Sequence, residues 1–315
     1  MCICACWKNC CLRVAESLPP FLLSPLAALG EAVDVAEQTL GAADLAFGHG
    51  MANAFDEAVY LVLHTLKLPL DELDSVRDRA LTIEERRAIA AIIDRRVRER
   101  IPAAYLTHEA WLGPYRFYVD ERVIVPRSFI AELLDEELSP WIEDVDGVAS
   151  VLDLCTGSGC LAIVAAMSFP NAHVDAADLS ADALDVARRN IGDYALETRV
   201  TPILSNMFAA LQGRTYDLII SNPPYVTGKS MAALPDEYHC EPKMALASGT
   251  DGLDHVRIIL RDAATHLNPG GLLVVEAGSN RDGVEAAFPR VPFTWAEVSA
   301  GDDIVFLLTR EELLG

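Results

Sequence analysis

The sequence predicts an α/β protein whose larger part is a seven-stranded, mostly parallel, doubly wound sheet, preceded by a small helical domain and a β-hairpin. Two observations carry this prediction. From Val151 onward, short apolar segments of strand length alternate with segments of helical periodicity, whereas from Glu31 to Ile101 the periodicity is helical throughout. At roughly 100 to 200 residues per domain, 315 residues are enough for two domains.

The helical region contains a clear start signal. Thr82 and Glu85 form a capping-box pattern ahead of apolar residues at helical spacing, which predicts a helix up to Ile101. The opposite face of this helix carries six arginines, and we expect it to be solvated rather than to bind an acidic partner or RNA. These residues are Arg86, Arg87, Arg95, Arg96, Arg98 and Arg100.

The segment that joins the two regions reads as a hairpin followed by a helix. Apolar and polar residues alternate from Tyr115 to Val125, with Asp120 and Glu121 at the expected turn, and Arg127 to Leu138 is expected to be helical. We therefore divide the chain as follows: an extension of unassigned role (1–25), a helical substrate-recognition domain (26–110), a hairpin and linker (111–135) and the sheet domain (136–315).

Seven strands and three helices are expected in the sheet domain. Because strands separated by helices form parallel sheets, most of this sheet should be parallel, but the last two strands are joined by the short Gly301 to Asp303 loop and should be antiparallel. The predicted strands are 151–154, 173–177, 200–204, 216–221, 272–276, 293–298 and 304–309, and the predicted helices are 161–167, 181–191 and 253–267.

The charge balance argues against nucleic acid as a partner. The chain has 25 basic and 47 acidic side chains, so its formal net charge is −22. Such a surface repels phosphate backbones and attracts basic proteins. We therefore expect no DNA partner and favour a basic protein.

Neither a membrane span nor a disulfide framework is expected. The longest apolar stretch, Leu18 to Leu29, is interrupted by three prolines. Five of the eight cysteines lie between Cys2 and Cys11, with no histidine or matching cysteine pair to complete a zinc site, so we predict no metal. The absence of a secretory signal pattern favours a reducing, cytoplasmic location.

The first motif with a chemical meaning is a glycine turn after the first predicted strand. Asp153 begins the run Asp-Leu-Cys-Thr-Gly-Ser-Gly, which ends at Gly159 where a helix is expected to begin. Glycines at such a position allow a ligand to approach the backbone, and Asp178, 21 residues beyond Gly157, can accept both hydroxyls of a ribose. The pair predicts a nucleoside-bearing cofactor rather than a dinucleotide or nucleoside triphosphate.

The second motif is Asn222-Pro223-Pro224-Tyr225, which follows the fourth predicted strand at its carboxyl end. Two prolines make the turn rigid and remove two backbone donors. The Asn222 oxygen and a proline carbonyl can together accept both hydrogens of a planar NH₂ group, while the Tyr225 ring covers its face. Neither His49, His239 nor His255 has a partner pattern, so none is assigned a role.

These residues resemble S-adenosylmethionine-dependent methyltransferases of class I that modify planar amino groups. Four stretches are similar to the HemK group of protein-(glutamine-N5) methyltransferases: 125–127, 152–159, 221–226 and 241–253. Three further stretches resemble its PrmB branch, which methylates large-subunit ribosomal protein L-three: 47–50, 100–107 and 292–295. The likeness runs from about Leu26 to the C-terminus.

The resemblance implies roles for particular residues. It implies S-adenosyl-L-methionine as the cofactor, with its methionine part held by Asp153 and the turn of Thr156, Gly157 and Gly159, its ribose by Asp178, and its adenine by Asn206, where the family usually has an aspartate. The implied catalytic residues are Asn222, Pro223 and Tyr225, and Asn222 is also expected to contact the cofactor. Arg127 and Pro224 are expected to contact the substrate, although a structural ion pair of Arg127 with Glu132 or another carboxylate explains Arg127 equally well.

Three other functions fit parts of the sequence. The release-factor branch shares the same motifs, and an adenine amino group has the same geometry as a glutamine amide once the base is flipped out. A non-catalytic module could keep the cofactor fold for ribosome assembly. The acidic charge disfavours the adenine methyltransferase, because it repels nucleic acid, whereas it suits L-three, which is a basic protein. The intact Asn222 to Tyr225 motif disfavours the non-catalytic module.

Overall fold

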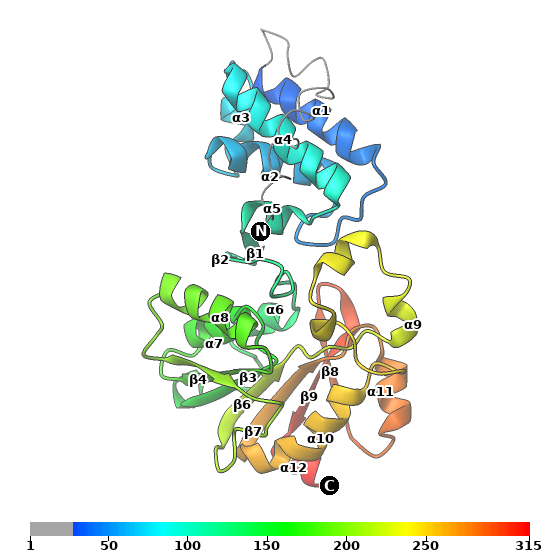
Figure 1. Cartoon of the computed structure of the whole chain (residues 1–315). Helices are drawn as coiled ribbons and strands as arrows, with labels where there is room; N and C mark the ends of the chain where they lie inside the picture. Colours follow the sequence, from blue (N-terminus) through cyan, green and yellow to red (C-terminus); the bar gives the residue numbers. More distant parts are fainter. Residues whose placement is uncertain (1–27) are drawn as a thin grey trace, which may run out of the picture. The chain divides into compact units, whose positions relative to one another are not determined.

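A computed structural model describes residues 28–315, which divide into two compact units between Thr107 and His108 (Figure 1). The cysteine run from Cys2 to Cys11 and the predicted extension 1–25 lie outside the described residues. Within the described part, no helix is both long and apolar enough to cross a membrane. The predicted domain boundaries differ from this division by a few residues and stay predictions.

The first unit is helical, as the periodicity predicts. Its helices pack around an apolar core that includes Leu29, Leu40 and Leu61, each fully buried. The Thr82 side chain accepts from the Glu85 backbone N–H and the Glu85 carboxylate accepts from the Thr82 N–H, so the predicted capping box is present. The helices are α1 (Leu29–Gly41), α2 (Ala54–Leu66), α3 (Leu73–Val76), α4 (Ile83–Glu99) and α5 (Ala103–Thr107).

The prediction of a solvated arginine face on α4 is wrong for two residues. Arg86 and Arg96 are buried, because α4 packs against both α1 and α2 and turns part of this face inward. The Arg96 guanidinium donates to the Glu57 carboxylate at 2.6 Å and to the Ala46 carbonyl at 3.1 Å. A buried arginine here serves packing within the helical unit instead of recognition of an acidic partner.

The second unit contains the predicted seven-stranded sheet, and all seven strands occur where the sequence places them. Three of them begin earlier than predicted, β3 by one residue, β7 by five and β9 by three. The loop between the last two strands is therefore Ser299–Ala300 rather than Gly301–Asp303. The strands are β3 (Ser150–Leu154), β4 (His173–Asp178), β5 (Val200–Leu204), β6 (Tyr216–Ser221), β7 (Leu267–Glu276), β8 (Thr294–Val298) and β9 (Gly301–Thr309).

The strand order is β5-β4-β3-β6-β7-β9-β8, with β9 antiparallel to both of its neighbours and all other pairs parallel. Alternate residues of each strand enter two separate apolar cores, as Val151 and Leu152 do. One core is closed by α6 (Ile130–Asp135) and α7 (Cys160–Ser168), and the other by α10 (Asp254–His266) and α11 (Arg281–Ala287). The doubly wound, mostly parallel sheet is therefore confirmed (Figure 1).

Shorter elements complete this unit. Helix α8 (Ala181–Asp193) follows β4, and α12 (Arg310–Leu314) ends the chain. Between β6 and α10 lie a short helix α9 (Gly228–Met231) and the 3₁₀ turns η4 (Asp236–Cys240) and η5 (Lys243–Ala245); a further turn, η3 (Val145–Gly147), precedes β3.

The predicted hairpin exists but lies earlier in the chain. Its strands are β1 (Ala110–Leu112) and β2 (Tyr115–Phe117), turning at Gly113 and Pro114. The expected turn at Asp120 is closed by its side chain, which accepts from the Arg122 N–H and guanidinium, and no strand follows. The buried valines after it gave the alternation that suggested a strand, but they pack onto the sheet unit instead.

Helix α6 is shorter than the predicted 127–138 segment. It begins at Ile130 because Arg127 and Ser128 use their side chains to bind distant carboxylates, and it ends at Asp135 because Glu137 and Leu138 have positive φ. The three residues ahead of α6 therefore bond carboxylates that are distant in sequence, Glu241 and Glu276.

Breaking the buried ion pair of the helical unit should be costly. Arg96→Leu leaves the Glu57 carboxylate without its charged partner in an apolar interior, so we expect the free energy of unfolding to fall by about 3 kcal/mol in urea titrations. Arg95→Leu is the matched control: Arg95 forms an exposed pair with Glu99, and its loss should cost no more than about 0.5 kcal/mol. Equal losses for the two variants would contradict the structural role of Arg96.

Candidate functional site

The site lies at the carboxyl edge of the parallel strands. In register, Leu154 of β3 pairs with Ala177 of β4 on one side and with Ser221 of β6 on the other. The Ser221 hydroxyl also donates to the Leu154 carbonyl at 2.7 Å. The glycine turn, Asp178 and the Asn222 turn, which are far apart in the sequence, consequently leave the sheet side by side, where open α/β sheets bind ligands.

The glycine turn needs its glycines. Gly157 and Gly159 have φ of +56° and +80°, in the left-handed region that favours glycine. A Cβ on Gly159 would also lie 3.1 Å from the Ala187 side chain, so helix α8 could not pack as closely against any other residue. A Cβ on Gly157 would meet no atom within 4 Å, which leaves the backbone of that residue open to a ligand.

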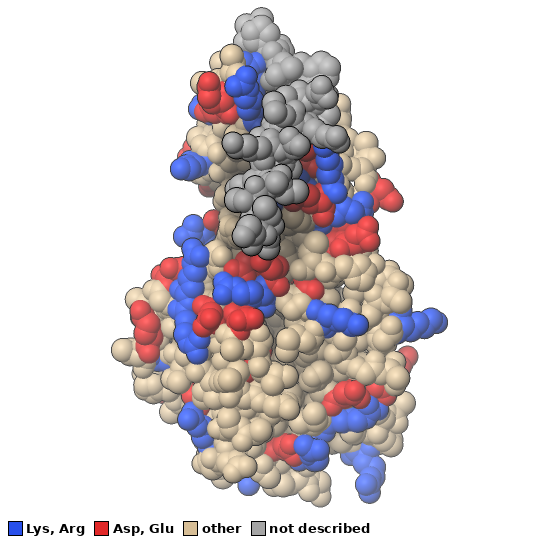
Figure 2. All heavy atoms as spheres, viewed as in Figure 1, with Lys and Arg blue, Asp and Glu red and all other residues tan. Residues whose placement is uncertain are grey.

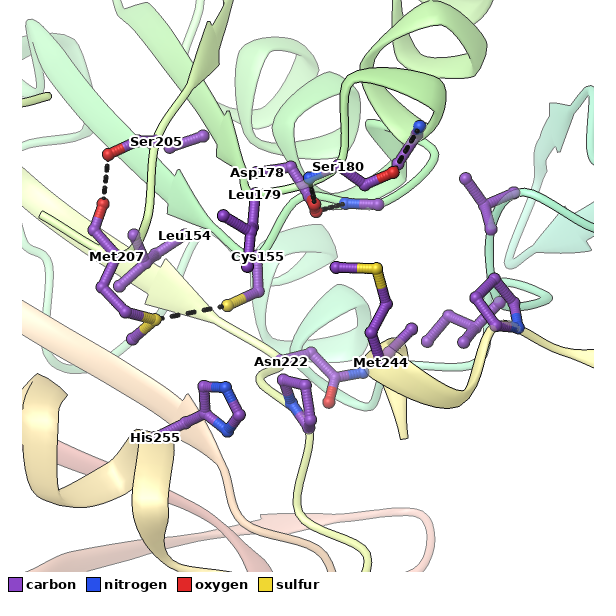
Figure 3. Close-up of a pocket in the computed structure, with 18 of the residues that line it drawn as sticks. Leu154, Cys155, Asp178, Leu179, Ser180, Ser205, Met207, Asn222, Met244 and His255 are labelled. Atoms are coloured by element: carbon purple, nitrogen blue, oxygen red, sulfur yellow. Dashed lines mark hydrogen bonds between the residues drawn. The ribbon is translucent and has the colours of Figure 1, made fainter. Parts of the chain in front are cut away.

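A cavity opens beside this turn, and we call it the glycine-turn cavity (Figure 3). Its polar lining includes Asp178, Asn206, Asn222 and His255. The apolar lining comes from both strands and loops, namely Leu154, Ala177, Leu179, Met207 and Met244. A molecule with hydroxyls at one end and a planar or aliphatic body would find matching surface here.

Asp178 keeps acceptor capacity inside the cavity. Its Oδ2 accepts from the Gly157 N–H at 2.8 Å and its Oδ1 from the Ser180 N–H at 2.8 Å. Each carboxylate oxygen can accept at least one more hydrogen bond, so two neighbouring hydroxyls can bind at once. Burial raises the pKa of Asp178, because its charged form is poorly solvated there. Hydrogen bonds from a ligand would stabilise that charged form.

The Asp153 carboxylate is buried beside the glycine turn. It is fully buried and does not line the cavity; one oxygen accepts from the Thr156 hydroxyl at 2.5 Å and from the Ala162 N–H at 3.0 Å. The other oxygen, Oδ1, has no partner among residues 28–315. Burial raises the pKa of Asp153 to about 7. A cationic group or a water molecule at Oδ1 would lower the cost of the buried charge.

A second cavity lies on the other side of Asn222, and we call it the Asn-Pro cavity. It is lined by Asn222, Pro223, Pro224, Tyr225 and, across from them, Arg127. The Asn222 amide and the Pro223 carbonyl have no hydrogen-bond partner within residues 28–315. Asn222 faces both cavities, so a group bound in one lies next to a group bound in the other.

The Tyr225 hydroxyl is bonded to Glu276, a residue that the sequence analysis did not predict as part of the site. Its hydroxyl donates to Glu276 Oε1 at 3.2 Å, and Glu276, at the end of β7, is 1% exposed. Burial raises the pKa of both groups. No sequence motif marks Glu276. Only the pairing of β6 with β7 places it beside Asn222.

Arg127 lies at the Asn-Pro cavity but is already paired. It donates to both oxygens of Glu241, at 2.5 and 2.7 Å, and Glu241 also accepts from the Val125 N–H. The guanidinium lies 5.5 Å from the centre of the Tyr238 ring. Of the two explanations for Arg127, the ion pair is present, and its partner is Glu241 rather than Glu132.

His255, to which the sequence gave no role, lines the glycine-turn cavity (Figure 3). Its Nδ1 lies 2.8 Å from the Ser248 hydroxyl, and its ring also bonds the Pro224 carbonyl. Burial lowers the pKa of His255, so the ring is neutral at pH 7. No pattern around His255 in the sequence could have indicated that the Pro-Pro turn would fold against it.

The described residues hold no metal-binding cluster, and one face of the molecule shows mixed charge. Among residues 28–315, no group of three or more His, Cys, Asp or Glu side chains is arranged to hold a metal ion. On the face drawn in Figure 2, basic and acidic side chains are interspersed. Nucleic-acid binding relies on gathered positive charge, which this face does not offer.

Comparison with known proteins identifies the family. Residues 131–250 match the family model "Methyltransferase small domain". The ribosomal protein uL3 glutamine methyltransferase of Neisseria gonorrhoeae is 60% identical over 273 residues, which cover 87% of this chain and 91% of that protein. This chain belongs to the ribosomal protein uL3 glutamine methyltransferase family. A member from Burkholderia pseudomallei is 54% identical over 92% of this chain and 97% of its own length.

The match to the family extends well beyond the cavities. It covers most of both units, so the helical unit belongs to the shared architecture along with the sheet. A solved methyltransferase from Pyrococcus furiosus is 18% identical, with a TM-score of 0.46 over 63% of this chain and 90% of that chain. The named relatives and the family model show that the chain is a methyltransferase, and the strand order of its sheet agrees with the predicted class I fold.

The buried carboxyl of Asp153 should make the free energy of unfolding depend on pH. Its pKa is about 7 in the folded protein and about 3.9 when unfolded, so between these values the folded state holds the extra proton. The stabilising contribution is complete below pH 4 and is lost as the pH rises through 7.

We therefore expect the unfolding midpoint of the ligand-free wild type, measured in urea, to fall relative to Asp153→Asn as the pH is raised from 5 to 8. Asp175→Asn, measured in parallel, is the control, because Asp175 lies on the neighbouring strand β4, outside the cavity, and is bonded to Arg214 and Tyr216. A constant difference between the wild type and Asp153→Asn across this range would contradict a raised pKa.

Proposed function

We propose that this protein transfers a methyl group from S-adenosyl-L-methionine to the side-chain amide nitrogen of a glutamine in large-subunit ribosomal protein uL3. One observation carries the proposal: the Asn222 amide oxygen and the Pro223 carbonyl, two acceptors without a hydrogen-bond partner within residues 28–315, belong to the turn that lines the Asn-Pro cavity, and Asn222 also lines the glycine-turn cavity. They match the two hydrogens of one amide group. We further assign the chain to the PrmB branch of the HemK group, on the stretches of sequence named above.

The residues of the glycine-turn cavity fit the cofactor. Asp178 has capacity for the two ribose hydroxyls. The Oδ1 of Asp153, which has no partner within residues 28–315, would bind the ammonium of the methionine part through a water, because Asp153 does not line the cavity. Thr156, Gly157 and Gly159 shape the turn that passes the methionine part. Asn206 lines the cavity and accepts from the adenine amino group without a charge. When bound, the cofactor supplies an electrophilic methyl group on a sulfonium.

Asn222 and Pro223 act on the substrate amide. An amide nitrogen is a poor nucleophile because its lone pair is delocalised into the carbonyl. Two acceptors that hold both N–H groups fix the nitrogen in one orientation and stabilise the positive charge that develops on it as the N–C bond forms. The nitrogen then loses one proton to water, so the reaction needs no general base.

Other residues of the Asn-Pro cavity shape the entry of the glutamine. Tyr225 and Pro224 present flat surfaces against the planar amide. Arg127 contributes to substrate binding with its edge that faces the cavity, while its ion pair with Glu241 keeps it in place.

The partner and the cellular location are inferred from the charge and the substrate. The net charge of −22 favours encounter with a basic ribosomal protein over DNA, and the helical unit is proposed to recognise that protein. Since uL3 is made and assembled into ribosomes in the cytoplasm, we place the enzyme there.

The proposal is tested by methyl transfer from radiolabelled S-adenosylmethionine. Purified uL3, a release factor and unmodified DNA are offered in parallel, and label is expected on uL3 alone. Label on the release factor or on DNA would overturn the substrate assignment, and no label despite cofactor binding would favour a non-catalytic module.

Asn222→Ala should lower the rate on uL3 by about 10²- to 10³-fold, the usual effect of removing one aligned hydrogen-bonding group from a transition state. Cofactor affinity, measured by calorimetry, is expected to change far less. Asn171→Ala, an exposed asparagine bonded to Asp146, is the matched control and should keep full activity. Normal turnover by the Asn222 variant would refute the role of the amide.

Asp178→Asn should weaken cofactor binding by about tenfold or more, because the charged acceptor for two hydroxyls becomes a neutral group with one acceptor oxygen. Isothermal titration with S-adenosylhomocysteine measures the change. Asp175→Asn, on the same strand but bonded to Arg214 and Tyr216 outside the cavity, is the control. Unchanged affinity in Asp178→Asn would remove Asp178 from the cofactor site.

A further inference from the structure

We propose that Glu276 is a positioning residue of the methyl-transfer site, which fixes the Tyr225 ring beside the Asn222–Pro223 acceptors through the Tyr225 hydroxyl. The inference rests on the proposed function and adds to it a residue that no sequence motif marks. Strand register, the hydrogen bonds to one buried carboxylate and the packing of the tyrosine ring support this role.

The register of the sheet brings Glu276 to the site. Ser221 of β6 pairs with Val275 of β7, so the next residues along the two parallel strands, Asn222 and Glu276, leave the sheet at the same level. Glu276 is 1% exposed. A carboxylate buried this deeply is stable only where several donors surround it.

Three donors reach Glu276, and they divide between its two oxygens. Oε2 accepts from the Ser128 hydroxyl at 2.7 Å and from the Phe129 N–H at 3.0 Å, while Oε1 accepts from the Tyr225 hydroxyl at 3.2 Å. One oxygen is thus anchored to the segment that precedes α6, and the other holds the tyrosine. Because one of the bonds to Oε2 comes from the Phe129 backbone, the carboxylate is held in place independently of the tyrosine.

The tyrosine ring has little room of its own. A Cβ on Gly278 would lie 2.8 Å from the Tyr225 ring, and a Cβ on Gly252 would lie 2.4 Å from the Tyr225 carbonyl oxygen. Both glycines have positive φ, +60° and +80°. Gly278 and Gly252 therefore lie so close to Tyr225 that its ring and its backbone have little room to move. The hydrogen bond to Glu276 fixes the position of the hydroxyl end of the ring.

This arrangement has a consequence for catalysis. The Tyr225 ring lines the Asn-Pro cavity with Asn222 and Pro223, where the substrate amide is proposed to lie. Displacing the ring changes the orientation of that amide relative to its two acceptors. Because methyl transfer depends on alignment, loss of the Glu276 contact should lower turnover more than it lowers binding.

The link between the two side chains can be observed without activity. In protein labelled with [4-¹³C]tyrosine, the Tyr225 Cζ signal is identified by its absence in Tyr225→Phe. In Glu276→Gln the Cζ signal should move upfield, toward the position of an ordinary phenol, because the hydroxyl no longer donates to a charged acceptor. An unchanged Tyr225 signal in Glu276→Gln would overturn the proposal.

Kinetics on uL3 test the positioning role. Glu276→Gln and Tyr225→Phe should each lower kcat by about tenfold with KM for the cofactor changed less than twofold, and the double variant should lose no more than either single one. Additive losses, or full activity in Tyr225→Phe, would contradict the proposal.

Two matched controls exclude nonspecific damage. Tyr194→Phe removes a hydroxyl that bonds the Arg116 backbone, and Glu132→Gln neutralises a carboxylate that accepts from Ser299; both lie outside the two cavities and should keep wild-type kcat. If Glu276→Gln unfolds, Gly278→Ala displaces the same ring without touching the carboxylate and should reproduce the fall in kcat; normal turnover by that variant would contradict the proposal.

The two proposals fail in different ways. A wild type that labels no uL3 refutes the proposed function, while the Tyr225 signal still reports on Glu276. An active wild type with an unshifted signal refutes the positioning role alone.

Discussion

The parallel pairing of β3, β4, β6 and β7 is the constraint on which the site depends. Because these strands run in one direction, the residues that follow them all emerge at one edge of the sheet. The glycine turn, Asp178, Asn222 and Glu276 meet there although more than a hundred residues separate the first from the last. The contacts of Ser221 with Leu154 and of Tyr225 with Glu276 follow from that pairing.

The edge gathers more negative than positive charge. Asp153, Glu241 and Glu276 are all buried there, and Arg127 is the cation that pairs with one of them. Such a wall favours a sulfonium cofactor and the positive charge that develops on an amide nitrogen during methyl transfer. The buried carboxylates of Asp153 and Glu276 cost stability when they are ionised without a ligand, which links the chemistry of the site to the pH dependence of the fold.

Local patterns predicted much of this protein. Strand positions were predictable because the short apolar segments alternate with helices and are bounded by turn residues, and the Thr82 capping box follows from side-chain chemistry within one helical turn. The glycine turn and the Asn222 turn were recognisable since each is continuous in sequence and follows a strand. Their meeting could be expected from the topology of parallel sheets.

What the sequence concealed depends on contacts between distant residues. Glu276 and His255 belong to the site only through folding, and neither has a local signature. The hairpin was misplaced because Val119, Val123 and Val125 alternate like a strand, although tertiary packing buries them without one. Arg96 was misread for the same reason: its charge suggests solvent, but α2 supplies Glu57 in the interior.

The most direct measurement is the crystal structure of the protein with S-adenosylhomocysteine and a glutamine-containing peptide of uL3. The account predicts the glutamine amide nitrogen within about 2.7 to 3.2 Å of both the Asn222 side-chain oxygen and the Pro223 carbonyl, with the sulfur of the cofactor product on the other side of Asn222. An amide that contacts neither acceptor, or a cofactor bound outside the glycine-turn cavity, would contradict it.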